Sequence, residues 1–349
     1  MNKLAIRRTI GVLIAAAAYA ASAAVAQTPS TEPVLIPSTG SGQALSKGSG
    51  QGFPSQPREF VAHTAAGGGT DQFARLIAEI FTREKLAPQA PQISNRVGGG
   101  GAIAYSYVKG KRGDPHVILT VATGTFLSAL TRPDLGFTID DFTPLAFFAM
   151  DPQIVAVSAD TKFNNVKDLI EAAKREPNTI VSAIASATGS GRLFQYMLEK
   201  ETGAKFKYVS FKSGSEAGTA VAGGHIQVTT ENLSEVAAHL ESKRVRVLAV
   251  TGERRMTALP AVPTMKELGY PIVVGTGRAF AMPAGVPRES AAAMEGLLKR
   301  AFNSKIWKDY SSINNFEDNF LDGAQFRKYI DTRREEFRGF LSHVGLLKK

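Results

Sequence analysis

From residue 58 onward, short apolar runs alternate with segments that carry a helical hydrophobic pattern. Helices are predicted where apolar side chains recur at the i, i+3, i+4 spacing of one helix face. They do so at Phe73, Leu76, Ile77, Ile80 and Phe81, at Val166, Leu169, Ile170 and Ala173, and at Phe326, Tyr329, Ile330, Phe337 and Phe340. Apolar runs predict strands at 59–65, 117–122, 145–150, 154–158, 180–183, 206–209, 226–230 and 245–250. Strands that alternate with helices of this length indicate parallel sheets covered on both faces. Because so long a chain exceeds what one core usually holds, we expect an α/β fold of two lobes.

The first 26 residues have the pattern of a secretory signal peptide. Lys3, Arg7 and Arg8 precede an apolar, alanine-rich stretch, and small residues at Ala24 and Ala26 suit a signal peptidase. We therefore expect cleavage near Ala26 and a periplasmic location. A retained anchor is the alternative, but alanine is too weakly apolar to hold a bilayer well. The arginine pair leaves both the general and the twin-arginine export routes open.

The amino-acid composition excludes several kinds of anchor, site and partner. Residues 27–57 are rich in Gly, Ser, Pro, Thr and Gln, carry almost no charge, and are expected to form a flexible linker. The chain has no cysteine, which excludes a lipid anchor, disulfides, zinc-thiolate sites and cysteine nucleophiles. The formal charge of +10 is scattered, which fits a solvated surface or a mild attraction of anionic solutes. Without a basic, aromatic-studded stripe, no nucleic-acid partner is expected.

Three strand–loop–helix junctions combine small residues, hydroxyls and backbone N–H groups. They comprise Gly67, Gly68, Gly69, Thr70 and Asp71, then Thr123, Gly124 and Thr125, and finally Ser186, Thr188, Gly189 and Ser190. The start of a helix offers unpaired N–H donors and a positive dipole end, which together bind a carboxylate or phosphate. For the first junction alone, a tight turn with Thr70 or Asp71 as the helix cap is an open alternative. Three such junctions over two lobes favour a cleft that binds an anion.

The sequence contains no convincing arrangement of catalytic residues. The first glycine run is followed by Thr70-Asp71, where a nucleotide-binding P-loop needs a lysine. The five histidines are widely separated, so no metal site is expected, and Ser190 lacks the Gly-x-Ser-x-Gly context of a hydrolase nucleophile. No pair of carboxylates has a spacing that suggests acid–base catalysis. We therefore expect neither an enzyme nor a cofactor.

Seven ordered blocks make the chain similar to a known family. They read GGGTDQFAR at 67–75, NRVGGGG at 95–101, DFTP at 141–144, GGHIQV at 223–228 with Glu231-Asn232, VLAVT at 247–251, ALPAVPT at 258–264 and MPAGVP at 282–287. From about residue 57 to 349, the chain resembles the tripartite tricarboxylate transporter receptors, also called Bug solute-binding proteins.

The resemblance implies a two-lobed periplasmic-binding-protein (Venus-flytrap) fold whose chain crosses between lobes twice. Lobe 1 would comprise residues 58–156 and 277–349, and lobe 2 residues 157–276. The first glycine loop and the facing Gly-Ser loop would grip one ligand carboxylate, and Lys212 and Asn232 correspond to further ligand-binding positions. Such a protein captures a small organic acid in an interlobe cleft and delivers it to integral-membrane permease subunits, here as a monomer. A sensor that presents its ligand to a membrane kinase is the alternative.

The chain departs from the family pattern around the expected cleft. Arg192 and Arg278 occupy positions that are usually neutral, and Glu231 replaces an aspartate. One hypothesis is that the two arginines clamp a second acidic group, so that the ligand is a dicarboxylate. Surface arginines or ion pairs between the lobes are the alternative. Apolar walls for such a ligand could come from Phe126, Phe194, Phe211 and Phe280.

Overall fold

The computed structural model describes residues 57–347. The predicted signal peptide, and the predicted linker up to residue 56, lie outside this range. The elements in chain order are β1 (Glu59–Ala62), α2 (Gly69–Arg83), β2 (Gln92–Asn95), η1 (Gly99–Gly101), α3 (Ala102–Gly110), β3 (Val117–Ala122), α4 (Thr123–Thr131), η2 (Pro133–Leu135), η3 (Ile139–Asp141), β4 (Phe142–Ser158), α5 (Val166–Arg175), β5 (Val181–Ile184), α6 (Ser190–Thr202), β6 (Lys207–Ser210), α7 (Gly214–Ala222), β7 (Val228–Asn232), α8 (Leu233–Glu241), β8 (Val245–Val250), β9 (Gly275–Pro283), α9 (Arg288–Asn303), α10 (Lys305–Asn314), β10 (Glu317–Asp322) and α11 (Gly323–His343). Within 57–347, no helix has both the length and the apolar character that crossing a bilayer requires.

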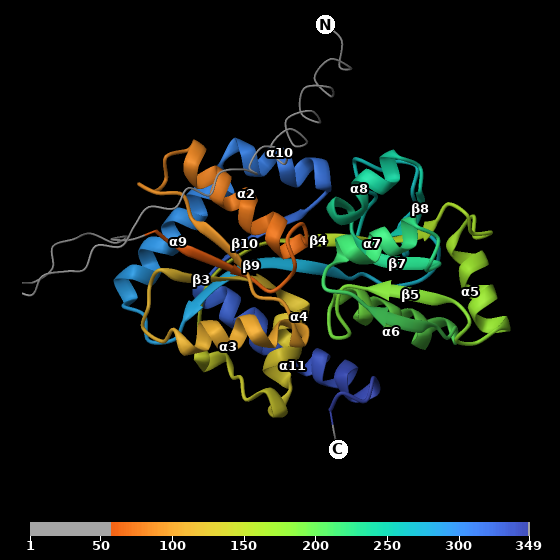
Figure 1. Cartoon of the computed structure of the whole chain (residues 1–349), viewed down its shortest axis with the longest axis horizontal. Coiled ribbons are helices and arrows are strands. Elements are labelled where there is room, and N and C mark those ends of the chain that lie inside the picture. Colours follow the sequence, from red (N-terminus) through yellow and green to blue (C-terminus); the bar gives the residue numbers. More distant parts are fainter. Residues whose placement is uncertain (1–56, 348–349) are drawn as a thin grey trace, which may run out of the picture. The chain divides into compact units, whose positions relative to one another are not determined.

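The strands form two hydrogen-bonded groups that share β4. The first group has the order β2-β1-β3-β9-β4, and the second has the order β4-β7-β5-β6. The first part of β4 also pairs with β10, and its last part with β8. The chain changes groups within three residues, because Asp151 is opposite Thr276 of β9 whereas Gln153 is opposite Asn232 of β7. It returns to the first group at Gly275, where β9 begins (Figure 1).

This arrangement is the α/β fold with two crossovers that the resemblance implied. The boundaries given above for the two lobes stay a prediction. The prediction of parallel sheets is confirmed only in part. Strand β1 is parallel to β2 and β3, and β5 is parallel to β6 and β7. However, β9 is antiparallel to β3 and β4, and β7, β8 and β10 are antiparallel to β4. The chain enters the second group along β4 and returns to the first group along β9. These antiparallel strands therefore need no helical crossover of the kind that parallel neighbours require.

Two predicted strand boundaries are also wrong. The runs at 145–150 and 154–158 belong to the single strand β4, although Asp151, Pro152 and Gln153 interrupt the apolar pattern. These three residues are buried at the crossing, where Asp151 and Pro152 pair with β9 and Gln153 pairs with β7. The strand predicted at 59–65 ends at Ala62, because the chain then turns toward the start of α2.

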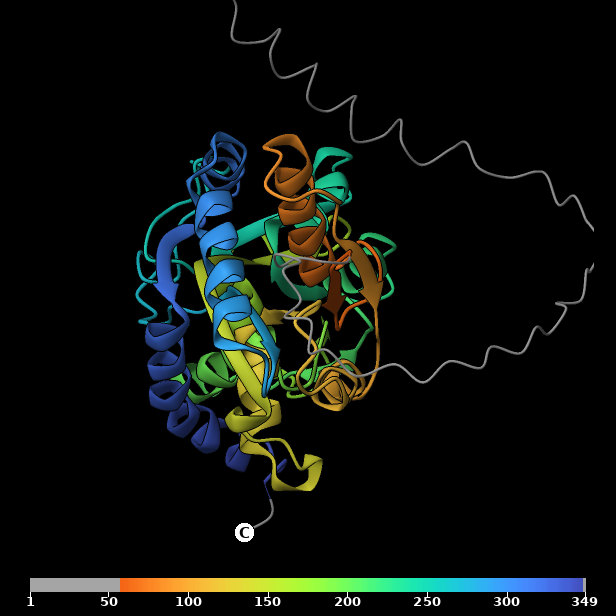
Figure 2. The ribbon, with the colours of Figure 1, turned by 90° about the vertical axis from the view of Figure 1, so that its left-hand side faces the viewer.

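Helices cover both faces of the first strand group. Helices α2, α9 and α10 share one hydrophobic core, and α3, α4 and α11 share the other. Accordingly, α2 and α11 lie on opposite faces of the sheet in both views (Figure 1, Figure 2). The predicted helical stripes are confirmed: Phe73 and Phe81 of α2 are buried in one core, and Phe326 and Phe340 of α11 in the other. Against the second strand group pack α5 and α6, and also α7 and α8.

Candidate functional site

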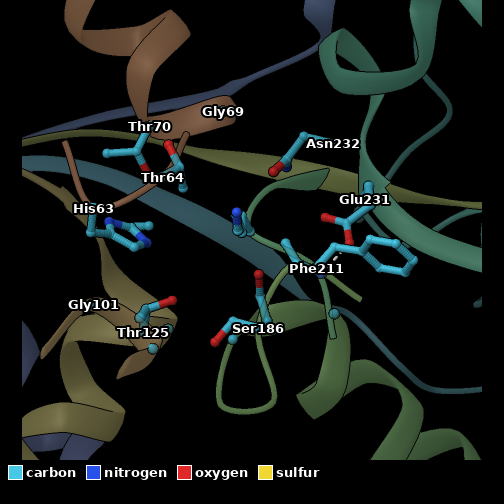
Figure 3. Close-up of a pocket in the computed structure, with 18 of the residues that line it drawn as sticks. His63, Thr64, Gly69, Thr70, Gly101, Thr125, Ser186, Phe211, Glu231 and Asn232 are labelled. Atoms are coloured by element: carbon cyan, nitrogen blue, oxygen red, sulfur yellow. Dashed lines mark hydrogen bonds between the residues drawn. The ribbon is translucent and has the colours of Figure 1, made fainter. Parts of the chain in front are cut away.

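A cavity of about 190 Å³ lies beside the crossing strands, with Gln153 of β4 and Arg278 of β9 in its wall. Its lining comes from both strand groups (Figure 3). The predicted ligand-binding residues that line it are Gly69, Thr70, Gly124, Thr125, Ser186, Gly189, Ser190, Lys212, Asn232 and Arg278. The structure therefore brings residues of all three predicted junctions to one place.

Three helices begin at this cavity. Gly69 is the first residue of α2, Gly124 the second of α4, and Ser190 the first of α6. A first-turn N–H group has no partner within its own helix, so each start contributes donors and the positive end of a helix dipole. The starts of α4 and α6 are in close contact, since a Cβ on Gly124 would lie 2.9 Å from the backbone nitrogen of Ser190. Together they form a polar, anion-binding wall.

The first-junction residues that do not line the cavity hold the loop in shape. The helix cap is Gly68, so the alternative of Thr70 or Asp71 as the capping residue is wrong. Asp71 is buried in the first turn, where its carboxylate accepts hydrogen bonds from Gly67 N (2.8 Å), Arg75 Nε (2.8 Å) and Asn95 Nδ2 (2.9 Å). These bonds fix Gly67, whose φ of +81° favours glycine.

Two residues of the other junctions likewise support the walls without lining the cavity. Thr123 Oγ1 accepts a hydrogen bond from Gly277 N (3.1 Å). The carbonyl oxygen of Thr188 accepts one from Ser128 Oγ (2.6 Å), which ties the α6 junction to α4. These contacts hold the starts of α4 and α6 in place.

The two arginines do not form a clamp. The Arg192 guanidinium lies over the Tyr208 ring, 3.9 Å from its centroid, and 4.0 Å from Glu199, so this residue is outside the cavity wall. Arg278 does reach the cavity, but it is only 2% exposed and is bound to the Asp151 carboxylate, with Nε 2.9 Å from Oδ2. Its Nη2 also donates to Asn232 Oδ1 (3.0 Å). Asp151 therefore balances the charge of Arg278, as in the ion-pair alternative.

Only one of the four predicted aromatic wall residues lines the cavity. Phe211 does so (Figure 3). Phe126, Phe194 and Phe280 are almost fully buried in three separate hydrophobic cores. Among the described residues, aromatic side chains therefore contribute little to the cavity wall.

Sequence reasoning missed a second glycine segment in the wall. Gly98, Gly99, Gly100 and Gly101 all line the cavity, and all four have positive φ angles, from +60° to +134°. Residues with a Cβ rarely adopt such a run of angles, which explains four consecutive glycines. The segment was visible as part of a family block, but its backbone conformation was not.

Two buried glutamates also line the cavity. Glu231 is 3% exposed and its Oε1 accepts a hydrogen bond from Ala185 N (2.7 Å). Glu235 is 8% exposed and its Oε1 accepts from Gly69 N (2.7 Å) and Gly214 N (3.1 Å). A protein carboxylate thus already occupies one donor at the start of α2.

Burial controls the protonation of these groups. It raises the pKa of Glu231 well above its usual value, and the negative charge of Glu235 raises it further. Burial also raises the pKa of Glu235, although Arg278 opposes this. His63, another wall residue, has its pKa lowered to about 4 by burial and by Arg278, so it is neutral at neutral pH.

Glu231→Gln is expected to raise the free energy of unfolding of the ligand-free protein at pH 8. Because the folded pKa lies above the unfolded one, the glutamate's contribution is full below the unfolded pKa and is lost as pH rises through the folded pKa. Glutamine imitates the protonated form, so its advantage should shrink at pH 5. Urea unfolding of both proteins at the two pH values measures this. The exposed Glu241→Gln is the control, and an equal advantage at both pH values would contradict the assignment.

Comparison with known protein families identifies the family of the chain. The family model described as "Tripartite tricarboxylate transporter family receptor" matches residues 73–346. The chain belongs to this family. Protein BugT of Bordetella pertussis is 25% identical over 297 residues, which cover 84% of this chain and 90% of BugT. The UPF0065 protein in the tcbD-tcbE intergenic region of Pseudomonas sp. (strain P51) is 29% identical over 254 residues, 71% of this chain and 74% of that protein.

Solved structures agree on the fold of this receptor. The periplasmic binding protein BugD superposes with a TM-score of 0.78 at 24% identity, over 85% of this chain and all of BugD. An R. palustris protein solved with adipate also gives 0.78 at 24% identity, over 84% of this chain and 98% of that one. The family is one of solute-binding receptors rather than enzymes, and its members act outside the cytoplasm. This chain is therefore a receptor of the tripartite tricarboxylate transporter family.

Proposed function

We propose that this receptor captures a small organic carboxylate in the cavity beside the crossing strands and, as a monomer, delivers it to integral-membrane permease subunits. The observation that carries the proposal is the meeting of three helix starts at one cavity. Aligned N–H groups and helix dipoles favour an anionic group, and the hydroxyls of Thr125 and Ser186 add further donors.

The size of the cavity supports a compact ligand. A volume of about 190 Å³ equals the space of about six water molecules in the liquid. The neighbour solved with adipate, itself a small carboxylate, supports the same ligand class. Export to the periplasm with cleavage near Ala26 belongs to the proposal, because delivery to a permease requires it.

The test is a thermal-shift screen of the purified mature protein over mono-, di- and tricarboxylates, followed by calorimetric titration of any ligand found. A ligand at a hundred times its Kd stabilises by about 2.7 kcal/mol, so a shift of at least about 5 °C is expected for one or more acids. The ligand should be recovered chemically unchanged after long incubation. If no carboxylate shifts the transition, or if a bound one is turned over, the proposal fails.

A further inference from the structure

The cavity has two chemically different ends, and this difference refines the proposed function, on which the inference rests. Figure 3 shows Thr125 and Ser186 on one side of the cavity and Gly69, Asn232 and Glu231 on the other. The first side carries the starts of α4 and α6, whose hydroxyl and N–H groups suit a carboxylate. On the second side, Glu235 already accepts the hydrogen bond from Gly69 N.

The second side presents acceptors rather than donors. While Oε1 of Glu231 bonds to Ala185 N, its other carboxylate oxygen points into the cavity (Figure 3). Oε2 of Glu235 and Oε2 of Glu231 both lie within 2.6 Å of the point where a Cβ on Gly214 would stand, so these two oxygens are neighbours. Only glycine at 214 leaves them room.

An independent group points to the same ligand chemistry. Gln153 lines the cavity and is 2% exposed, and its Oε1 has no hydrogen-bond partner among the described residues. A buried acceptor left without a donor costs free energy that a ligand donor would recover. Gln153 belongs to β4, whereas Glu231 belongs to β7 and Glu235 to α8.

The local charge balance disfavours a second ligand carboxylate at this side. Three buried carboxylates, of Asp151, Glu231 and Glu235, surround the single buried guanidinium of Arg278. Asp151 and Asn232 already bind that guanidinium. Lys212, the other cation in the wall, is exposed at the cavity surface. Burial alone disfavours the ionised forms of Glu231 and Glu235. A cationic donor would be attracted to their carboxylates and would favour the ionised forms, whereas a further anion would raise the pKa of both groups still more.

We propose that Glu231, Glu235 and Gln153 form a subsite for the ammonium group of the ligand. The receptor then selects an amino-acid-like zwitterion over the matching plain acid. The ligand carboxylate lies at the starts of α4 and α6, and its ammonium group donates hydrogen bonds to the two glutamates and to Gln153 Oε1. The diacid hypothesis drawn from the two arginines is thereby replaced.

The experiment compares matched ligand pairs by calorimetric titration: aspartate against succinate, glutamate against glutarate, and 4-aminobutyrate against butyrate. In the wild type, the aminated member of at least one pair should bind at least tenfold more tightly. Glu231→Gln and Glu235→Gln should each reduce that preference at least fivefold, while affinity for the plain acid stays within twofold or rises. The exposed Glu241→Gln on α8 is the matched control and should keep the full preference.

The possible outcomes separate this inference from the proposed function. If plain acids bind as tightly as their aminated partners, the ammonium subsite is wrong but the carboxylate receptor stands. If the preference exists and survives both glutamate variants, the subsite lies elsewhere and the assignment is overturned. If no carboxylate binds, with or without an amine, both proposals fail. The wild-type comparison holds even if a variant folds poorly.

Discussion

Replacing Arg278 by glutamine is expected to lower the free energy of unfolding by about 3–5 kcal/mol, the usual cost of leaving a buried charge without its partner. Asp151 is 2% exposed and would lose two hydrogen bonds, and Asn232 Oδ1 would lose another. Both the carboxylate and the guanidinium lie where the chain crosses between the strand groups. Urea unfolding followed by circular dichroism measures the loss.

Two further variants make this expectation specific. The exposed Arg300→Gln on α9 should change the free energy of unfolding by less than about 0.5 kcal/mol. The double variant Arg278→Met with Asp151→Leu removes both buried charges and should recover more than half of the loss. A single-variant loss below 1 kcal/mol would show that Asp151 finds compensation elsewhere. The ion pair would then not be a structural one.

The second large effect concerns Gly124. Changing it to valine is expected to reduce affinity for the best carboxylate by more than a hundredfold. The new Cβ would lie 2.9 Å from the backbone nitrogen of Ser190, and backbone cannot move aside as a side chain can. The variant can relieve this clash only by separating the start of α4 from the start of α6, which breaks the anion-binding wall. Calorimetric titration measures the affinity.

Small-angle scattering distinguishes this cause from misfolding. Saturating ligand should reduce the radius of gyration of the wild type, because closure around a ligand makes contacts that an open form lacks. The Gly124→Val variant should stay folded and show no such contraction. Gly296→Val is the control, since nothing lies within 4 Å of its Cβ position, and it should bind and contract normally. A Gly124 variant that binds within tenfold of the wild type would refute the role of this close contact.

The sequence predicted those elements whose own residues carry the pattern. Strands β3 and β8 were predicted at the bounds that the structure has, 117–122 and 245–250, because each is an apolar run. Strand β9 was missed, since Gly275, Gly277 and Arg278 break any such run. Its arginine is tolerated only because Asp151 lies on the neighbouring strand, and that partner is 127 residues away in sequence. No local pattern contains this information.

The same distinction applies to the site. The three helix-start junctions could be predicted because glycines and hydroxyls at a strand–helix boundary have local consequences. The inward position of Glu235 could not, because the packing of α8 against α7 and β7 decides which way its first turn faces. The prediction that Arg192 contacts the ligand was wrong for the same reason, since α6 directs its side chain toward Tyr208 and Glu199 rather than toward the cavity.

The unbroken course of β4 also bears on how this protein melts. Over seventeen residues, one strand supplies hydrogen bonds to β9 and β10 at one end and to β7 and β8 at the other. Neither strand group can lose its hydrogen-bonded pairing with β4 without removing the strand that completes the other group. The two strand groups and the cores packed against them are therefore expected to unfold as one cooperative unit, for which the calorimetric and van't Hoff enthalpies of unfolding should coincide.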